Sequence, residues 1–532
     1  MQTSNLSDQR ILIGLLIAAA VAMLLTVQPS PHLCNDSTRL AFADALVNHG
    51  TFAIDGTYFE STCDRVTRNG KFYSDKPPVL SLGLAGVLWF VQTATGWRIP
   101  DDLSAVYQTI TLLSSGIAWF VAFFGIIRWL ALVGIDRRRA EIAAAVGLST
   151  TLFFVFTTTI NNHTVAGALL VWCLVHATPA PDGPGSHQHM AWLGFLAGLA
   201  CVIDPLAVSF ATPLVGFSMW ERRRRLASLL PLAAGLVPIG VHVTLNLLSG
   251  AHPILVLDPE AFAFAGSMHD STTMTGTAWK HDDLGDLVEY GFHSLIGHRG
   301  LFVYSPLAGA GLVGLALGLR RNEETRLRRL WWALSSGLVV FMLLTVGFSN
   351  NYSGWTYGVR WHCVAIPILV AGIALGDARL QGVARTRWRS ICGVLALAGA
   401  ALTGIGTIQP WTTVKSCGPQ SSVVAVLSDS PVLVHGEARA ASSMNRAGRH
   451  LEARLLAGYA LRRNPRDKRA LVAGLEAAIG LGDREDVGAL WLMVRTVEWS
   501  ASDYAYLERM SAQVLDEIPG AQEQLAPQGE TR

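Results

Sequence analysis

The residues best suited to chemistry lie in a polar segment near the start of the chain, residues 35–78. The segment opens with Asp36, directly after the first apolar stretch, and closes with Asp75-Lys76, directly before the next one. Ionisable residues at the edges of apolar segments mark functional sites in membrane proteins. A carboxylate can accept a proton and an ammonium can stabilise negative charge, so the segment predicts acid–base chemistry beside an anion. The alternative is a solvated loop in which Asp36 caps a helix.

The elements that position this segment are predicted to be transmembrane helices. Of the 532 residues, 51% are hydrophobic and only 15% are charged, and the mean hydropathy is +0.36. Many windows of about 20 apolar residues are long enough to span a bilayer. We therefore expect an all-α, polytopic transmembrane bundle with a small soluble appendage. The net charge of +2 gives no indication of a nucleic-acid partner.

Four short clusters of basic residues predict the topology. Short loops rich in arginine stay on the cytoplasmic side, so all four clusters should face the cytoplasm of a plasma-membrane protein. This arrangement gives about eleven spans, a cytoplasmic N-terminus, and an extracytoplasmic position for residues 35–78 and for the C-terminal tail. One predicted span is the helix Glu141–Ile160, and Met190–Trp220 is predicted to be an outward-and-back pair that breaks at Asp204-Pro205. The clusters are Arg137 to Arg139, Arg222 to Arg225, Arg320 to Arg329, and Arg385 to Arg389.

The apolar segment 79–93 is predicted not to cross the membrane. If it crossed, every later loop would change sides and all four arginine clusters would face outward. At about 15 residues the segment is also short for a span. We therefore predict a juxtamembrane helix on the outer face, with Lys76 at its start.

Further polar residues stand at the predicted outer ends of later helices: Asn162, His163, Asp204, Arg299 and Arg360. Each also has a structural explanation, because amides and imidazoles satisfy helix ends and arginines reach lipid phosphates. The histidines and aspartates of residues 269–283 lack the spacing of a zinc site. The predicted inner loops carry arginines and little else, so chemistry is expected to face outward.

Two cysteines of the first outer loop, Cys34 and Cys63, could form a disulfide in an oxidising compartment. Cys417 is a third outer cysteine and could compete for either of them.

The composition changes after Pro410, and residues 411–532 are polar and contain no span. Gly448 and Gly482 lie 34 residues apart, and Pro465 stands between them. This period is that of the tetratricopeptide hairpin, so residues 440–500 are predicted to be TPR-like, with an ordinary helical domain as the alternative. Such a tail could bind a protein.

With these residues in view, the chain resembles the GT-C glycosyltransferases. An acid after the first span, followed by Gly-Thr-Phe, Ile-Asp-Gly and Tyr-Ser-Asp-Lys-Pro-Pro, is similar to the first outer loop of protein O-mannosyltransferases and lipid A aminoarabinose transferases. Tyr-Ser-Pro at 304–306 and Tyr-Gly-Val-Arg-Trp at 357–361 extend the likeness in outline to about Ile408. The likeness does not cover the tail.

The resemblance implies an enzyme that moves a sugar from a polyprenyl-phosphate carrier to an acceptor outside the membrane, with inversion at the anomeric carbon. Asp36 would be the general base. The resemblance also implies cations for the donor phosphate, and the candidates are Lys76, Arg360 and Arg299. Supporting residues would be Asp75, Asn162, His163, Asp204 and Tyr73.

Two positions depart from the family pattern. Asn35 stands where the family has the first of two acids, and Asn161-Asn162-His163 stand where the second outer loop usually carries one. A divalent metal shared between these loops would lose a ligand, so no metal cofactor is supported. The rival interpretations are a transporter or flippase of lipid-linked sugars, for which Asp204 could serve, and a non-catalytic scaffold.

Overall fold

The computed structural model divides the chain into two compact units, Met1–Leu427 and Ser428–Arg532. The predicted boundary after residue 410 differs from this division over residues 411–427. Of these, only residue 411 is described. The described residues are 6–31, 34–62, 64–179, 183, 186–223, 226–253, 259–262, 264, 279–297, 299–320, 324–350, 352–354, 356–408, 410–411, 441–442, 445, 448, 450–463 and 465–515.

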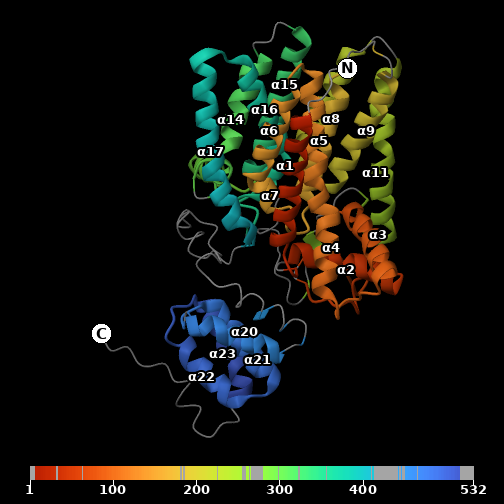
Figure 1. Cartoon of the computed structure of the whole chain (residues 1–532). Coiled ribbons are helices and arrows are strands. Elements are labelled where there is room, and N and C mark those ends of the chain that lie inside the picture. Colours follow the sequence, from red (N-terminus) through yellow and green to blue (C-terminus); the bar gives the residue numbers. More distant parts are fainter. Residues whose placement is uncertain are drawn as a thin grey trace. The chain divides into compact units, whose positions relative to one another are not determined.

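The first unit is a bundle of helices that run side by side (Figure 1). Neighbours in space include α9 with α11 and α14 with α16. A Cβ on Gly311 of α14 would lie 2.0 Å from the carbonyl oxygen of Leu369 in α16, so glycine permits this close contact. The helices of the bundle are α1 (Leu6–Thr26), α4 (Leu103–Thr111), α5 (Ile117–Leu132), α6 (Arg137–Ser149), α8 (Asn162–Ala177), α9 (Ser186–Ile203), α10 (Val208–Glu221), α11 (Leu230–Leu248), α14 (Pro306–Leu315), α15 (Thr325–Met342), α16 (Ile366–Arg379) and α17 (Gly382–Ile408).

Shared acids connect the arginine clusters at one end of the bundle, called here the arginine end. Asp377 pairs with Arg389 at 2.6 Å and with Arg139 at 3.5 Å. Glu221 pairs with Arg329 at 2.7 Å, and thus connects the end of α10 to the start of α15. Trp129, near the end of α5, bonds to Thr178, and the next carbonyl, that of Pro179, accepts from Arg222. Members of all four clusters therefore lie at the same end of the bundle, as the topology prediction requires.

The opposite end of the bundle, called here the site end, is where helices break. The predicted helix through residue 160 instead ends at Ser149 and resumes as α7 (Leu152–Val155), because Thr150 and Thr151 turn their hydroxyls back onto backbone carbonyls of α6. The break predicted at Asp204 is present. Short elements stand at helix breaks and helix ends at both ends of the bundle, with η3 and η5 beside arginine clusters. They are η2 (Pro205–Ala207), η3 (Leu226–Leu229), α13 (Leu301–Tyr304), η5 (Ala316–Arg320), η6 (Leu343–Gly347) and η7 (Arg360–Val364).

The polar segment folds into a helix and a hairpin at the site end. Helix α2 (Cys34–His49) is followed by strands β1 (Arg65–Arg68) and β2 (Lys71–Ser74), which pair antiparallel with Val66 opposite Tyr73. Asn69 and Gly70 supply the positive φ values that the tight turn needs. This hairpin departs from the all-α prediction, whereas the other regular elements of the described residues are helical.

Helix α3 (Pro78–Thr95) is 18 residues long, which corrects the predicted length of about 15. Pro78 suits the first turn, and Gly96 ends the helix in the left-handed conformation with φ 78°. Its length therefore no longer argues against crossing. Helix α3 packs against α2, and Figure 1 shows both at one end of the bundle. Its juxtamembrane position stays a prediction.

The chain is a multi-pass membrane protein, because several of its helices are long and apolar enough to cross a bilayer. Large apolar side chains such as Leu25 and Leu397 are exposed on them, as expected of surfaces that face lipid. The count of eleven spans stays a prediction. Five segments are long and apolar enough to cross a membrane: Pro78–Thr95, Leu103–Leu132, Leu226–Leu248, Thr325–Gly347 and Gly382–Ile408.

The second unit is helical, as the sequence predicts for the tail. Ala470, Leu475 and Trp491 lie in its small core. Gly482 ends α21 in the left-handed conformation, which explains one of the two spaced glycines. The TPR-like assignment stays a prediction. The helices are α20 (His450–Arg463), α21 (Lys468–Leu481), α22 (Arg484–Val494) and α23 (Ala501–Leu515).

We predict that Lys71→Cys and Asp101→Cys, placed before and after α3, react with an impermeant thiol reagent in intact cells. Arg138→Cys should react only after permeabilisation, because Leu103–Leu132 separates it from the site end. All three native residues are exposed. The unsubstituted protein gives the background labelling. Labelling of Lys71→Cys without Asp101→Cys would mean that α3 crosses the membrane.

Candidate active site

Asp36 lies fully buried in the first turn of α2. The hydroxyl of Tyr107, on α4, donates a hydrogen bond to its carboxylate at 2.7 Å. The start of a helix favours negative charge, so both the helix and the phenol stabilise an ionised Asp36. The carboxylate is therefore more than a cap: it is held in place by a side chain 71 positions away.

Arg39 lies one turn after Asp36 on α2 and is also buried. One of its nitrogens, Nη2, donates to the side-chain oxygen of Asn162 at 3.1 Å. Its Nε and Nη1 have no hydrogen-bond partner among the described residues. Burial lowers the pKa of Arg39 to about 10, and the nearby Arg360 acts in the same direction. A buried guanidinium with unused donors is suited to binding an anion.

The start of α8 carries Asn161, Asn162 and His163, whose roles differ. Asn161 caps the helix, because its side chain accepts from the backbone N–H groups of His163 and Thr164. Its own N–H donates to Ser115 in a π-helical turn, η1 (Leu112–Gly116). The cap is thus supplied by Asn161, which leaves Asn162 and His163 available to the cluster of charges.

His163 pairs with Asp204, which stands at the break between α9 and α10. Asp204 also accepts from the N–H of Leu206, so it caps η2 and holds the imidazole at once. Both residues are buried. The pair connects α8 to the α9–α10 corner beside Arg39 and Asn162.

Lys76 pairs with two carboxylates, those of Asp64 and Asp75, each at 2.8 Å from its ammonium nitrogen. Burial acts to lower the pKa of Lys76, but the two acids outweigh it and the pKa is raised. The lysine therefore stays charged, and it closes the polar segment by joining the start of the hairpin to the start of α3. Much of the charge of Lys76 is already compensated by these two carboxylates.

Arg360 opens η7 and is partly buried. Its backbone N–H donates to the hydroxyl of Ser353 at 3.1 Å, and its guanidinium lies 5.2 Å from the ring centre of Trp411. Its Nε has no hydrogen-bond partner among the described residues. Burial lowers the pKa of Arg360, although four nearby carboxylates counteract it: those of Asp64, Asp36, Asp204 and Asp75.

Arg299 is fully buried and donates to the backbone carbonyl of Thr356. Thr356 stands four residues before Arg360, in a segment where Tyr352 and Ser353 have positive φ values of 48° and 64°. Arg299 therefore supports the segment that presents Arg360. The neighbouring His298 and Trp355 lie outside the described residues.

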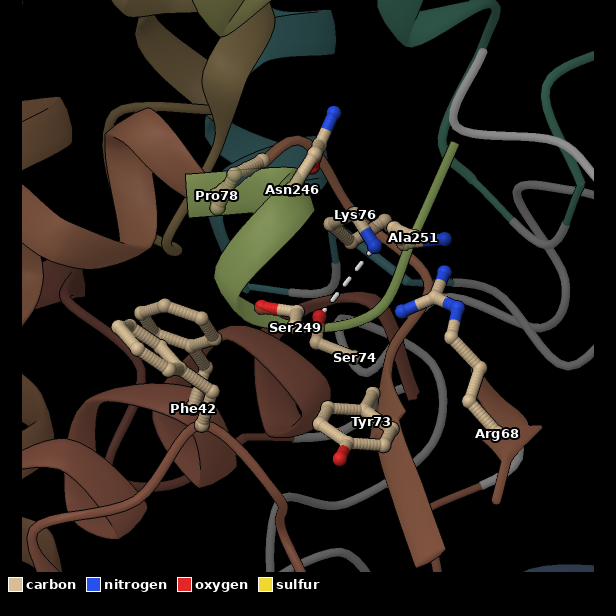
Figure 2. A pocket seen from close by; sticks show the side chains of 10 residues that line it. Phe42, Arg68, Tyr73, Ser74, Lys76, Pro78, Asn246, Ser249 and Ala251 are labelled. Atoms are coloured by element: carbon tan, nitrogen blue, oxygen red, sulfur yellow. Dashed lines mark hydrogen bonds between the residues drawn. The ribbon is translucent and has the colours of Figure 1, made fainter. Parts of the chain in front are cut away.

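A cleft opens beside Lys76, between the hairpin, α2 and the end of α11 (Figure 2). Its empty space is about 350 Å³, the open solvent at its mouth included. Tyr73 lies at its edge beneath Arg68, whose guanidinium is 5.5 Å from the ring centre. Tyr73 thus belongs to this cleft. The lining residues are Phe42, Phe52, Arg68, Tyr73, Ser74, Lys76, Pro78, Asn246, Ser249 and Ala251.

Cys34, at the start of α2, is disulfide-bonded. Its predicted partner Cys63 lies outside the described residues, as does Cys417. Among the described residues, no three His, Cys, Asp or Glu side chains are grouped so as to hold a metal ion. Asp64 and Asp75 pair with Lys76, Asp36 accepts from Tyr107, and Asp204 pairs with His163. Carboxylates with these partners do not form the ligand set of a shared metal.

The structure brings most of the predicted residues to one end of the bundle, and it adds three that the sequence analysis missed. These are Arg39, Asp64 and Tyr107, which look like ordinary helix and loop residues in the sequence. The spacing of Arg39, one turn after Asp36, was an available signal. Nothing local in the sequence marks Tyr107.

We predict that Lys76→Met destabilises the protein by roughly 3–5 kcal/mol, because two buried carboxylates lose their cation. Lys71→Met, at an exposed position of the same hairpin, should leave the melting temperature unchanged. Because the pKa of Lys76 is raised in the folded protein, its contribution to the free energy of unfolding is complete below about pH 10.4. That contribution is lost as the pH rises through the folded-state pKa. Thermal unfolding in detergent measures both variants, and equal melting temperatures would contradict the role of the pair.

No family model matches the chain, and no curated protein matches it. Two solved structures do: ArnT from Cupriavidus metallidurans in the apo state, and the same protein bound to undecaprenyl phosphate. Both are 14% identical to this chain, with a TM-score of 0.48. The first alignment covers 91% of this chain and 78% of that one, and the second covers 90% and 79%. In the path of its backbone the protein is similar to this ArnT.

Proposed function

We propose that the protein is an integral-membrane glycosyltransferase. It moves a sugar from a polyprenyl-phosphate donor to an acceptor on the extracytoplasmic side, by a displacement that inverts the anomeric carbon. The observation that carries the proposal is the cluster of the buried Asp36 and Arg39 with the partly buried Arg360, in which a held carboxylate lies near cations with unused donors. The resemblance of the first outer loop to GT-C enzymes supports the same class.

Asp36 is the general base. The acceptor hydroxyl is a weak nucleophile, and Asp36 accepts its proton as the oxygen attacks the anomeric carbon. The bond from that carbon to the phosphate oxygen breaks, and the carrier leaves as lipid phosphate. Tyr107 donates to one oxygen of the carboxylate and so holds the group in place. A single displacement with one base gives inversion.

The donor phosphate is held between Arg39 and Arg360, with Lys76 beside it. The charge of Arg360 acts to lower the pKa of Arg39, so an anion between the two arginines relieves their repulsion. Lys76 already pairs with two acids and contributes less free charge, while it forms a wall of the cleft in Figure 2 through which the phosphate enters. Arg299 acts by supporting the segment before Arg360.

The remaining predicted residues support these groups. Asn162 orients Arg39, Asp75 orients Lys76, and Asp204 holds His163 at the start of α8. The tail, placed outside the membrane by the topology prediction, is a candidate site for a protein partner. Among the described residues, no group of acids and histidines fits a metal ion, and no proposed step depends on one.

We predict that Asp36→Asn lowers turnover by about 100- to 10,000-fold, the range that a positioned general base contributes. The amide keeps an acceptor for Tyr107, so the protein should fold normally. Purified protein, radiolabelled polyprenyl-phosphate sugars and an extract of cell-envelope acceptors provide the assay. Asp101→Asn, an exposed acid at the same end, is the matched control. Near-normal turnover of Asp36→Asn would reject its role.

We predict that Arg39→Gln and Arg360→Gln each weaken the binding of polyprenyl phosphate by roughly ten- to a hundredfold. Each removes a charge-assisted hydrogen bond of about 1.5–3 kcal/mol. Lys76→Gln should lose less binding, because its charge is shared with two acids. Arg98→Gln, which removes an exposed arginine at the same end, is the control. Unchanged affinity in both arginine variants would exclude this phosphate site.

A further inference from the structure

Helix α12 (Leu284–Leu295), which precedes Arg299, presents three distinct faces. At about 100° per residue, Tyr290 and Ser294 fall on one side, and both are buried. Acidic residues occupy a second side. A third side carries large apolar side chains that are exposed: Leu284 at 73%, Val288 at 61%, Phe292 at 51% and, just beyond the helix, Ile296 at 54%.

The buried side of α12 attaches it to the site end of α15. His281, just before the helix, bonds to the carbonyl of Val346 at 2.6 Å. The hydroxyl of Tyr290 contacts the hydroxyl of Ser349 at 3.2 Å and accepts from the N–H of Tyr352 at 3.0 Å. These contacts fix the helix in rotation, so the exposure of its apolar side is a property of the fold.

The apolar side continues the surface that α15 presents to lipid. Val339 and Leu343, in the last turns of the candidate span Thr325–Gly347, are 59% and 57% exposed. Helix α12 packs against η6, which forms the end of that span. Its apolar stripe therefore lies beside the end of that candidate span. An amphipathic helix attached at this level is suited to lie in the membrane interface.

The charged side of α12 excludes one kind of lipid contact. Asp286 and Glu289 are exposed there, and the helix carries no lysine or arginine. Contact with lipid must then depend on apolar burial, and anionic headgroups should not strengthen it. The described neighbours of α12 leave the stripe uncovered, while the adjoining span requires lipid at the same level.

We propose that α12 is an interfacial helix whose Leu284, Val288 and Phe292 are buried in the lipid of the leaflet at the site end. The partner is a lipid surface, and the contact depends on acyl chains instead of headgroup charge. This inference is independent of the proposed function. One consequence rests on that function. Tyr290 stacks on Tyr352 with ring centres 4.2 Å apart, and Ser353, the next residue, accepts from the backbone N–H of Arg360. The depth of α12 in the membrane therefore also sets the depth of Arg360.

The test places an environment-sensitive fluorophore on Val288→Cys, in full-length protein reconstituted into nanodiscs of zwitterionic lipid. Lipids that carry a nitroxide near the top of the acyl chain should quench it at least twofold more than a water-soluble paramagnetic reagent. Glu289→Cys, about 100° around the helix, should show the reverse order. The unsubstituted protein gives the background from native cysteines.

The same measurement on Phe292→Cys keeps the test valid if the first variant folds poorly. Adding anionic lipid should leave the lipid quenching unchanged. Stronger quenching by the soluble reagent at both apolar positions would overturn the proposal, because the stripe would then face water. Protection from both quenchers would also overturn it, because another part of the chain or a second copy would then cover the stripe.

Discussion

The structure of the site depends on the need to compensate charges that are buried at one end of a membrane bundle. A buried charge without a partner is strongly destabilising, so each one must find a counter-charge or a hydrogen bond from another element. Lys76 does so with Asp64 and Asp75, and the carboxylate of Asp204 does so with the imidazole of His163. Arg39 and Arg360 do so only in part, since some of their donors remain unused among the described residues. That shortfall distinguishes a binding site from a purely structural network.

Breaks in the helices make this arrangement possible. A continuous helix satisfies its own backbone and projects side chains only sideways, whereas a helix that begins within the site offers free N–H groups and end residues. Asp204 at the α9–α10 corner and Asn161 at the start of α8 both cap helix ends. The first two residues of α8, Asn162 and His163, therefore lie in the cluster. Capping and chemistry are thus performed by adjacent residues.

The two ends of the bundle use charge in different ways. At the arginine end, Asp377 and Glu221 bridge basic clusters that are largely exposed, and such pairs add little stability. The arginines themselves are the basis of the topology prediction, which places their loops on the cytoplasmic side. At the site end the charges are more deeply buried, so the electrostatic interactions between them are stronger.

The sequence by itself determined that this is a helical membrane protein. It also predicted that the arginine clusters lie on one side and that most of the polar site residues lie on the other. These features are local: apolar length, short basic loops, and ionisable residues next to apolar segments. It could not determine that Tyr107 holds Asp36, that Lys76 is shared by two acids, or that Asn161 is the cap beside His163. It also predicted a single helix through residue 160 and missed the β-hairpin. Pairings across 71 or 123 positions arise from the packing of helices against one another, and no local pattern encodes that packing.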